Sequence, residues 1–231
     1  MNLREILEIG FGGNPLGIAD WHPEGNGGFI TTKKNLQLLS QNLPEHVRYV
    51  GVDHTHRFSP EELATSSKWL RSYIGRARAM LEFYDHHAAE FPSISLFEMD
   101  SRNLSFEDQR FNEIHLYYVL SDPSVAIGDS QSILSQARRV LVPGGILIVL
   151  GEKYWLNNES NRIVDRESQA ENIIKESGFA IKSEPDALEK ASCIGSLSRN
   201  LYEFRCRGVD RSGGFDSGAY LFIAKLESKL L

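Results

Sequence analysis

The sequence predicts an α/β fold in which a seven-stranded, mostly parallel sheet is covered by helices on both faces and ends in an antiparallel strand. Short apolar runs alternate with amphipathic segments along most of the chain, and this alternation is typical of strands joined by helical crossovers. The strand-like runs are continuously apolar, as expected for a sheet buried on both faces. The last two runs have no regular helix between them, which indicates an antiparallel strand at the end of the chain.

The elements follow from the spacing of apolar residues and from the residues that end each run. Apolar residues recur every three or four positions at 60–90 and at 129–142, which is the helical period. Pro44 ends a shorter helix near 33–42, and Gly178 is expected to be the C-terminal cap of the helix near 165–177. Helices are expected near 33–42, 60–90, 129–142 and 165–177. Strands are expected at about 5–9, 46–53, 93–100, 113–120, 145–151, 179–185 and 219–227.

The turn after the first strand carries the strongest functional signal in the sequence. The run ILEIGFGG leads from a short apolar strand into Glu8, Gly10 and Gly12. Gly10 permits a tight turn out of the strand, and Gly12 lets a ligand approach the backbone closely. Glycines in such a turn also serve simple chain reversal. The pattern therefore predicts either a nucleotide site or a tight turn, and the order of the later elements favours the nucleotide site.

Composition and charge argue against several classes of protein. The net charge of −6 disfavours a broad nucleic-acid surface. No apolar run approaches the roughly 20 residues of a membrane span, and the start of the chain has no signal-peptide pattern. Cys193 and Cys206 are the only cysteines and lack CxxC spacing, which argues against a disulfide framework or a thiolate metal site. We expect a cytoplasmic protein without a metal ion.

No linker divides the chain. Low-complexity runs and fixed-period repeats are absent from the 231 residues, a length that suits one large α/β domain. We therefore expect a single domain over 1–231, with inserted loops near 13–32 and 186–217.

Four segments resemble the class I S-adenosylmethionine-dependent methyltransferases. They are EIGFG at 8–12, VGVD at 50–53, FEMDS at 97–101 and ARRVLVPGGILIV at 137–149. The last is the most discriminating, because a helix followed by Pro-Gly-Gly and a buried strand is characteristic of this family. The resemblance covers nearly the whole chain. It implies a Rossmann-like sheet of seven strands whose last strand is antiparallel.

The resemblance also implies S-adenosylmethionine as cofactor and suggests which residues hold it. Asp53 resembles the acid that accepts hydrogen bonds from both ribose hydroxyls, a task that suits a carboxylate. Its alternative role is to cap a turn. Asp100 and Ser101 resemble the pair that contacts the adenine edge, and His54 lies where a side chain often meets the adenine. The expected cofactor-binding residues are Glu8, Gly10, Phe11, Gly12, Asp53, His54, Asp100, Ser101 and Leu120.

The residues that would bind the methyl acceptor are harder to identify from the sequence. Methyl transfer needs alignment and exclusion of water, and it needs a base only when the acceptor must lose a proton. Asp122, at the end of the fourth expected strand, is the candidate catalytic residue that would orient or deprotonate a nucleophile. Ser-Asp-Pro at this point is also a common turn starter, and the turn is the favoured interpretation.

The sequence departs from the family pattern after Gly12. Asn14 and Pro15 stand where the family has a third glycine and a helix start, and the next helix is expected only near residue 33. The intervening loop at 17–32 is either a lid with glycine hinges or a surface loop without a catalytic role.

Three hypotheses remain. The first is a methyltransferase acting on an acceptor that we expect to be a small molecule, with a tRNA methyltransferase as a variant disfavoured by the acidic charge. The second is a non-catalytic protein of methyltransferase type that binds cofactor or a partner. The third is an NAD(P)-dependent oxidoreductase, whose ribose acid should lie about 20 residues beyond the glycines, whereas Asp53 lies 41 residues beyond Gly12.

Overall fold

A computed structural model describes residues 3–21, 24, 31–55, 58–66, 68–120, 125–157, 162–182, 192–194 and 219–226. Seven strands form one sheet in the order β3-β2-β1-β4-β5-β9-β8. Neighbours from β3 to β5 pair in parallel, whereas β9 runs antiparallel to both β5 and β8. The predicted sheet is therefore confirmed. Its strands are β1 (Arg4–Ile9), β2 (Val47–Asp53), β3 (Ile94–Glu98), β4 (Phe111–Tyr117), β5 (Leu141–Glu152), β8 (Phe179–Lys182) and β9 (Ala219–Leu226).

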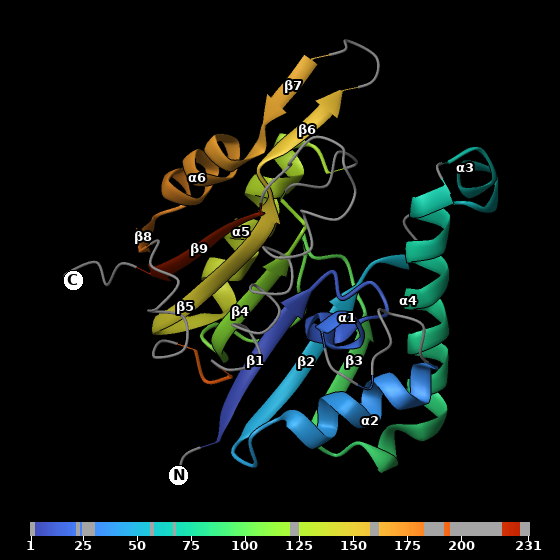
Figure 1. The fold of residues 1–231 in the computed structure, drawn as a ribbon. Helices are drawn as coiled ribbons and strands as arrows, with labels where there is room; N and C mark the ends of the chain where they lie inside the picture. The colour runs from blue at the N-terminus through green and yellow to red at the C-terminus, as the bar shows by residue number, and fades with distance from the viewer. Residues whose placement is uncertain are drawn as a thin grey trace.

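Helices cover both faces of the sheet (Figure 1). On one face, the buried side chains of α1, α2 and α4 share a core with the strands, and on the other face those of α5 and α6 do so. The two cores follow from strands that are apolar on both sides. The helices are α1 (Ile18–Trp21), α2 (Thr32–Asn42), α3 (Pro60–Thr65), α4 (Lys68–His87), α5 (Ile127–Val140) and α6 (Arg166–Glu176), with short 3-10 turns η1 (Pro15–Gly17) and η4 (Ala88–Glu90).

Three elements differ from the sequence prediction. The helix expected at 60–90 is divided, because Ser66 has an extended backbone and caps the end of α3. Residues 142–145 interrupt the pairing of β5 with β4, so that the Pro-Gly-Gly segment lies within an irregular strand. A hairpin of β6 (Tyr154–Asn157) and β7 (Arg162–Asp165) projects from one end of the sheet (Figure 1). In the sequence, aromatic and β-branched residues flank a polar run at 157–162, which is a hairpin signal.

Within the described residues, no helix combines the length and apolarity needed to cross a membrane.

A buried polar network ties the segment at 192–194 to the middle of β4. The Glu113 carboxylate lies 2.6 Å from His115 Nε2 and accepts a 2.7 Å hydrogen bond from the Cys193 backbone N–H. The Ser192 hydroxyl donates to the same carboxylate. Burial acts to raise the pKa of Glu113, but the charge of His115 and these hydrogen bonds outweigh it and hold the pKa below its ordinary value. Glu113 is therefore an ionised hub that joins residues about 80 positions apart.

Candidate functional site at the carboxyl edge of the sheet

The candidate site lies where the strand order reverses. β1 stands between β2 and β4, so the chain moves outward in one direction from β1 to β3 and in the other from β4 onward. The carboxyl ends of β1, β2 and β4 meet at this edge. Open α/β sheets bind ligands in the crevice outside such a switch point.

Asp53 ends β2 and contacts the glycine turn that follows β1. Its Oδ2 accepts a 2.9 Å hydrogen bond from the Gly12 backbone N–H and a 3.2 Å hydrogen bond from the Tyr73 hydroxyl of α4. The residue is only 7% exposed. This burial raises the pKa of Asp53 to about 6, although the bonds from Gly12 and Tyr73 favour the ionised form. The acid and the turn that the sequence paired as a nucleotide site are thus in direct contact.

Glu8, the other acid of the turn, is buried beneath the chain that follows it. Its Oε2 accepts hydrogen bonds from the Tyr49 hydroxyl at 2.5 Å and from the Leu16 backbone N–H at 2.8 Å. Burial raises the pKa of Glu8 to about 7, despite these two bonds. Phe11 and Leu120 are also buried, each in one of the two cores. In this structure Glu8 stabilises the turn through its hydrogen bonds with Tyr49 and Leu16.

Asn14 organises the loop in which the family has a third glycine. Its side-chain oxygen accepts a 2.9 Å hydrogen bond from the Ala19 backbone N–H. Asn and Ser side chains commonly satisfy free N–H groups at helix starts in this way. The short turns η1 and α1 therefore lie between the glycine turn and α2, in a stretch where the sequence predicted only a loop.

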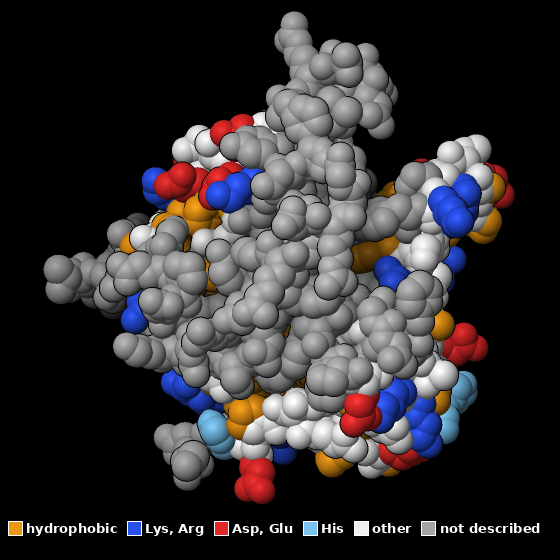
Figure 2. Space-filling view, viewed as in Figure 1, with side chains coloured by type: hydrophobic (Ala, Val, Ile, Leu, Met, Phe, Trp, Pro, Cys, Tyr) orange, Lys and Arg blue, Asp and Glu red, His pale blue; other side chains and the backbone are white. Residues whose placement is uncertain are grey.

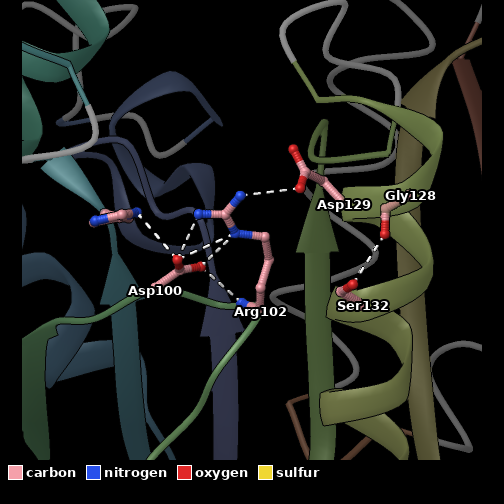
Figure 3. A network of polar contacts seen from close by, with 6 residues as sticks. Asp100, Arg102, Gly128, Asp129 and Ser132 are labelled. Carbon is pink, nitrogen blue, oxygen red and sulfur yellow. Dashed lines mark hydrogen bonds and ion pairs between the residues drawn. The ribbon is translucent and has the colours of Figure 1, made fainter.

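A second cluster of charges lies beyond β3 (Figure 3). Arg102 donates to both oxygens of Asp100 and, through Nη1, to Asp129 of α5 at 3.0 Å. The hydrogen bonds from Arg102 hold the pKa of Asp100 at about 2, well below its usual range. His54 Nδ1 lies 3.8 Å from Asp100 Oδ2, and Ser101 is half-buried beside it. The three residues expected near the adenine thus stand at the edge, with Asp100 held in an ion pair with Arg102.

Two residues at this edge were not predicted from the sequence. Neither Tyr73, on the helix expected at 60–90, nor Arg102 is among the residues that the sequence predicts for the site. The position of Arg102 two residues after Asp100 was a usable signal, because short loops often pair neighbouring charges. No local sequence pattern predicts the role of Tyr73, since its approach to Gly12 depends on how a distant helix packs against the glycine turn. The candidate catalytic residue Asp122 lies outside the described residues.

A cavity of about 250 Å³ lies between α2 and α4 beside the glycine turn. Gly13 and Asn14 contribute to its wall from the turn, and four residues of α4 form the opposite side. The lining residues are Gly13, Asn14, Ala19, Thr32, Asn35, Ser72, Gly75, Arg76 and Ala79.

We expect Gly13→Ala to lower the free energy of unfolding by about 2 kcal/mol. Gly13 has a φ of +73°, and an added Cβ would lie 2.6 Å from the backbone carbon of Arg76. Gly75→Ala is the matched control in α4: a Cβ there meets nothing within 4 Å, so stability should rise by about 0.5–1 kcal/mol. Urea unfolding measures both. An unchanged Gly13→Ala protein would show that the turn does not pack on α4 as described.

Comparisons with known proteins agree with the fold. No protein-family model and no curated protein matches the sequence. Among solved structures, a protein from Pyrococcus horikoshii matches with a TM-score of 0.52 and 14% identity over 98% of this chain and 83% of that one. A SAM-dependent methyltransferase from Aquifex aeolicus matches with a TM-score of 0.48 and 12% identity over 97% and 82%. One from Methanosarcina mazei matches with 0.48 and 16% over 97% and 93%. The likeness to the Pyrococcus horikoshii protein, at 14% identity, concerns the fold alone, and the sheet described above has the Rossmann-like order that the resemblance implies.

Proposed function

We propose that this protein is an S-adenosylmethionine-dependent methyltransferase whose cofactor binds at the carboxyl edge over β1 and β2. The observation that carries the proposal is the contact between Asp53 and the Gly12 backbone. It places a buried carboxylate and a glycine turn together at the switch point of the sheet.

The residues at this edge fit the adenosine part of such a cofactor. Above pH 6 Asp53 is mainly ionised, and a carboxylate can accept hydrogen bonds from two adjacent hydroxyls. Asp100 follows β3, the next strand along the edge, and His54, which comes directly after Asp53, has its Nδ1 3.8 Å from Asp100 Oδ2. The carboxylate of Asp100 is an acceptor suited to an exocyclic amine.

The protein's part in the reaction is alignment and protection. The chemistry that bound S-adenosylmethionine supplies is a methyl carbon made electrophilic by a positively charged sulfur. Asp53, Gly10 and Gly12 would hold the nucleoside end of the cofactor at the carboxyl ends of β1 and β2. Asp122, which follows β4 in sequence, is the residue that we propose to orient the acceptor. Displacement at carbon is then accelerated chiefly by holding the reactants in line and excluding water.

We propose a small molecule as the acceptor. The chain carries a net charge of −6. On the face in Figure 2, the described Lys and Arg side chains lie among Asp and Glu. Binding of a polyanion such as tRNA depends on a concentrated positive surface, which the described residues on this face do not form.

We expect Asp53→Ala to weaken the binding of S-adenosylhomocysteine by about 1.5–3 kcal/mol, roughly 10-fold to 150-fold, because a hydrogen bond to a charged acceptor is lost. Isothermal titration calorimetry measures the change. The control is Asp108→Ala, whose side chain is 71% exposed and pairs with Arg139 away from the edge. Equal affinity of the Asp53→Ala and wild-type proteins would show that Asp53 does not hold the ribose.

Parallel titrations with NADH and NADPH separate the competing classes. Binding of a dinucleotide without S-adenosylhomocysteine would favour an oxidoreductase. A non-catalytic role is supported by one observation, which is that Asp53 and Gly12 already contact Tyr73. Binding of S-adenosylhomocysteine with no methyl transfer to any acceptor in a screen would favour that role.

A further inference from the structure

We propose that Tyr73 closes the cofactor site by standing where the nucleoside would lie, and that the ligand binds only when this side chain leaves. The inference rests on the proposed function. It adds a gating residue from α4 that controls access to Asp53 and Gly12.

The ring of Tyr73 fills the space that the missing side chain of Gly12 leaves. A Cβ added to Gly12 would lie 2.3 Å from Tyr73 Cε2 and 2.9 Å from Cδ2. A Cβ on Gly10 would lie 3.4 Å from the Tyr73 hydroxyl oxygen. Glycines in such turns allow another group to approach the backbone closely. Here the group that approaches is a side chain of the same protein.

The hydroxyl of Tyr73 takes the acceptor that a ribose hydroxyl would use. It donates to Asp53 Oδ2 at 3.2 Å, the oxygen that also receives the Gly12 N–H. A buried carboxylate needs such donors, because leaving it unpaired is costly. The tyrosine therefore satisfies Asp53 in the closed state, and a ribose hydroxyl can replace it without leaving the acid unpaired.

The structure leaves room for this part of α4 to adjust. Tyr73 is followed on α4 by Gly75 and Arg76, and the adjoining side of the helix borders the 250 Å³ cavity. The α4 residues that line this space are exposed to solvent, so tight interior packing does not hold this side of the helix in place. Further along the helix, Tyr84 anchors α4 to β3 by donating to the Ile94 carbonyl at 2.6 Å. Movement is thus expected near Tyr73 and not near Tyr84.

Closure lowers the apparent affinity for the nucleoside. The apparent dissociation constant equals the intrinsic one divided by the fraction of molecules in the open state. Removing the hydroxyl alone should weaken the closed state, and removing the ring should abolish it. Tyr73→Phe and Tyr73→Ala are the two test variants, and Tyr84→Phe on the same helix is the matched control.

The first measurement needs no ligand. The proteins are treated with a water-soluble carbodiimide and glycine ethyl ester, and modification of Asp53 is quantified by peptide mass spectrometry. We expect Tyr73→Ala to raise modification of Asp53 several-fold over the wild-type and Tyr84→Phe proteins. Circular dichroism and thermal unfolding confirm that each variant is folded, and Tyr73→Phe provides a gentler variant should Tyr73→Ala unfold.

The second measurement is titration with S-adenosylhomocysteine. Tyr73→Phe should bind about threefold to tenfold more tightly than wild type, as expected for the loss of one competing hydrogen bond. Tyr73→Ala should bind more tightly still, and Tyr84→Phe should stay within about twofold of wild type.

The outcomes separate this inference from the proposed function. Unchanged modification of Asp53 in Tyr73→Ala would overturn the closure, whatever the ligand does. Increased modification with weaker binding of S-adenosylhomocysteine would overturn the competition and make Tyr73 a ligand contact. Increased modification with no binding by any variant would leave the closure supported and overturn the proposed function. Increased modification with tighter binding supports both.

Discussion

Replacing Glu113 with alanine is expected to lower the free energy of unfolding by about 3–5 kcal/mol, because several buried donors lose their shared acceptor at once. Glu113 is 1% exposed, and His115 beside it is fully buried. Without the carboxylate, the imidazole loses its acceptor at Nε2, and the backbone N–H of Cys193 loses its 2.7 Å hydrogen bond. Buried donors left in this way are expensive.

Urea unfolding followed by circular dichroism measures the effect. Glu107→Ala serves as the control, since Glu107 is exposed on the loop that precedes β4, and its removal should change stability by less than about 0.5 kcal/mol. Hydrogen exchange at Cys193 and Ile194 should also accelerate in the Glu113→Ala protein. A loss below about 1 kcal/mol would show that the segment at 192–194 is held by other contacts.

Glu8→Gln is expected to stabilise the protein by about 3 kcal/mol at pH 8 and by only about 1 kcal/mol at pH 5. Burial raises the pKa of Glu8 from its ordinary value of 4.5 to about 7. The folded state therefore retains the proton of Glu8 over a range of pH in which the unfolded chain has lost it. Stability due to protonated Glu8 is complete below pH 4.5 and is lost as the pH rises to 7. Glutamine resembles the protonated acid and avoids this loss.

The test compares urea unfolding of the two proteins at pH 5, 6, 7 and 8. Subtracting the wild-type values removes the contribution of Asp53, whose pKa burial also raises. Glu82→Gln, at an exposed position of α4, is the control and should give a difference that does not vary with pH. A Glu8→Gln protein that is less stable than wild type at pH 8 would mean that ionised Glu8 is favoured in the folded state.

Several parts of the site could be predicted because they depend on neighbours in sequence. Asp53 follows a buried apolar strand directly, and the carboxyl ends of adjacent parallel strands meet at one edge of the sheet. Its contact with Gly12 follows from that register, in which Ile9 lies opposite Val52. The end of the helix at Gly178 could also be predicted from local sequence, since the positive φ that ends many helices favours glycine.

Other parts depend on contacts between elements that are distant in sequence. The approach of Tyr73 to Gly12 depends on how α4 packs against the turn, and neither segment alone indicates it. The acidity of Asp100 depends on the side-chain conformation of Arg102, which also reaches Asp129 of α5. The hub at Glu113 exists only because the segment at 192–194 returns to β4.

The sequence by itself determined the order of the seven sheet strands along the chain, the antiparallel last strand and the acid and glycines at the switch point. These features follow from local periodicity, turn chemistry and the rule that parallel strands need crossovers. Only the tertiary structure decided the surroundings of those groups. Burial raises the pKa values of Glu8 and Asp53, and Tyr73 covers the turn. Both effects arise from packing in three dimensions, because desolvation and steric contact depend on groups that the chain brings together only when it folds.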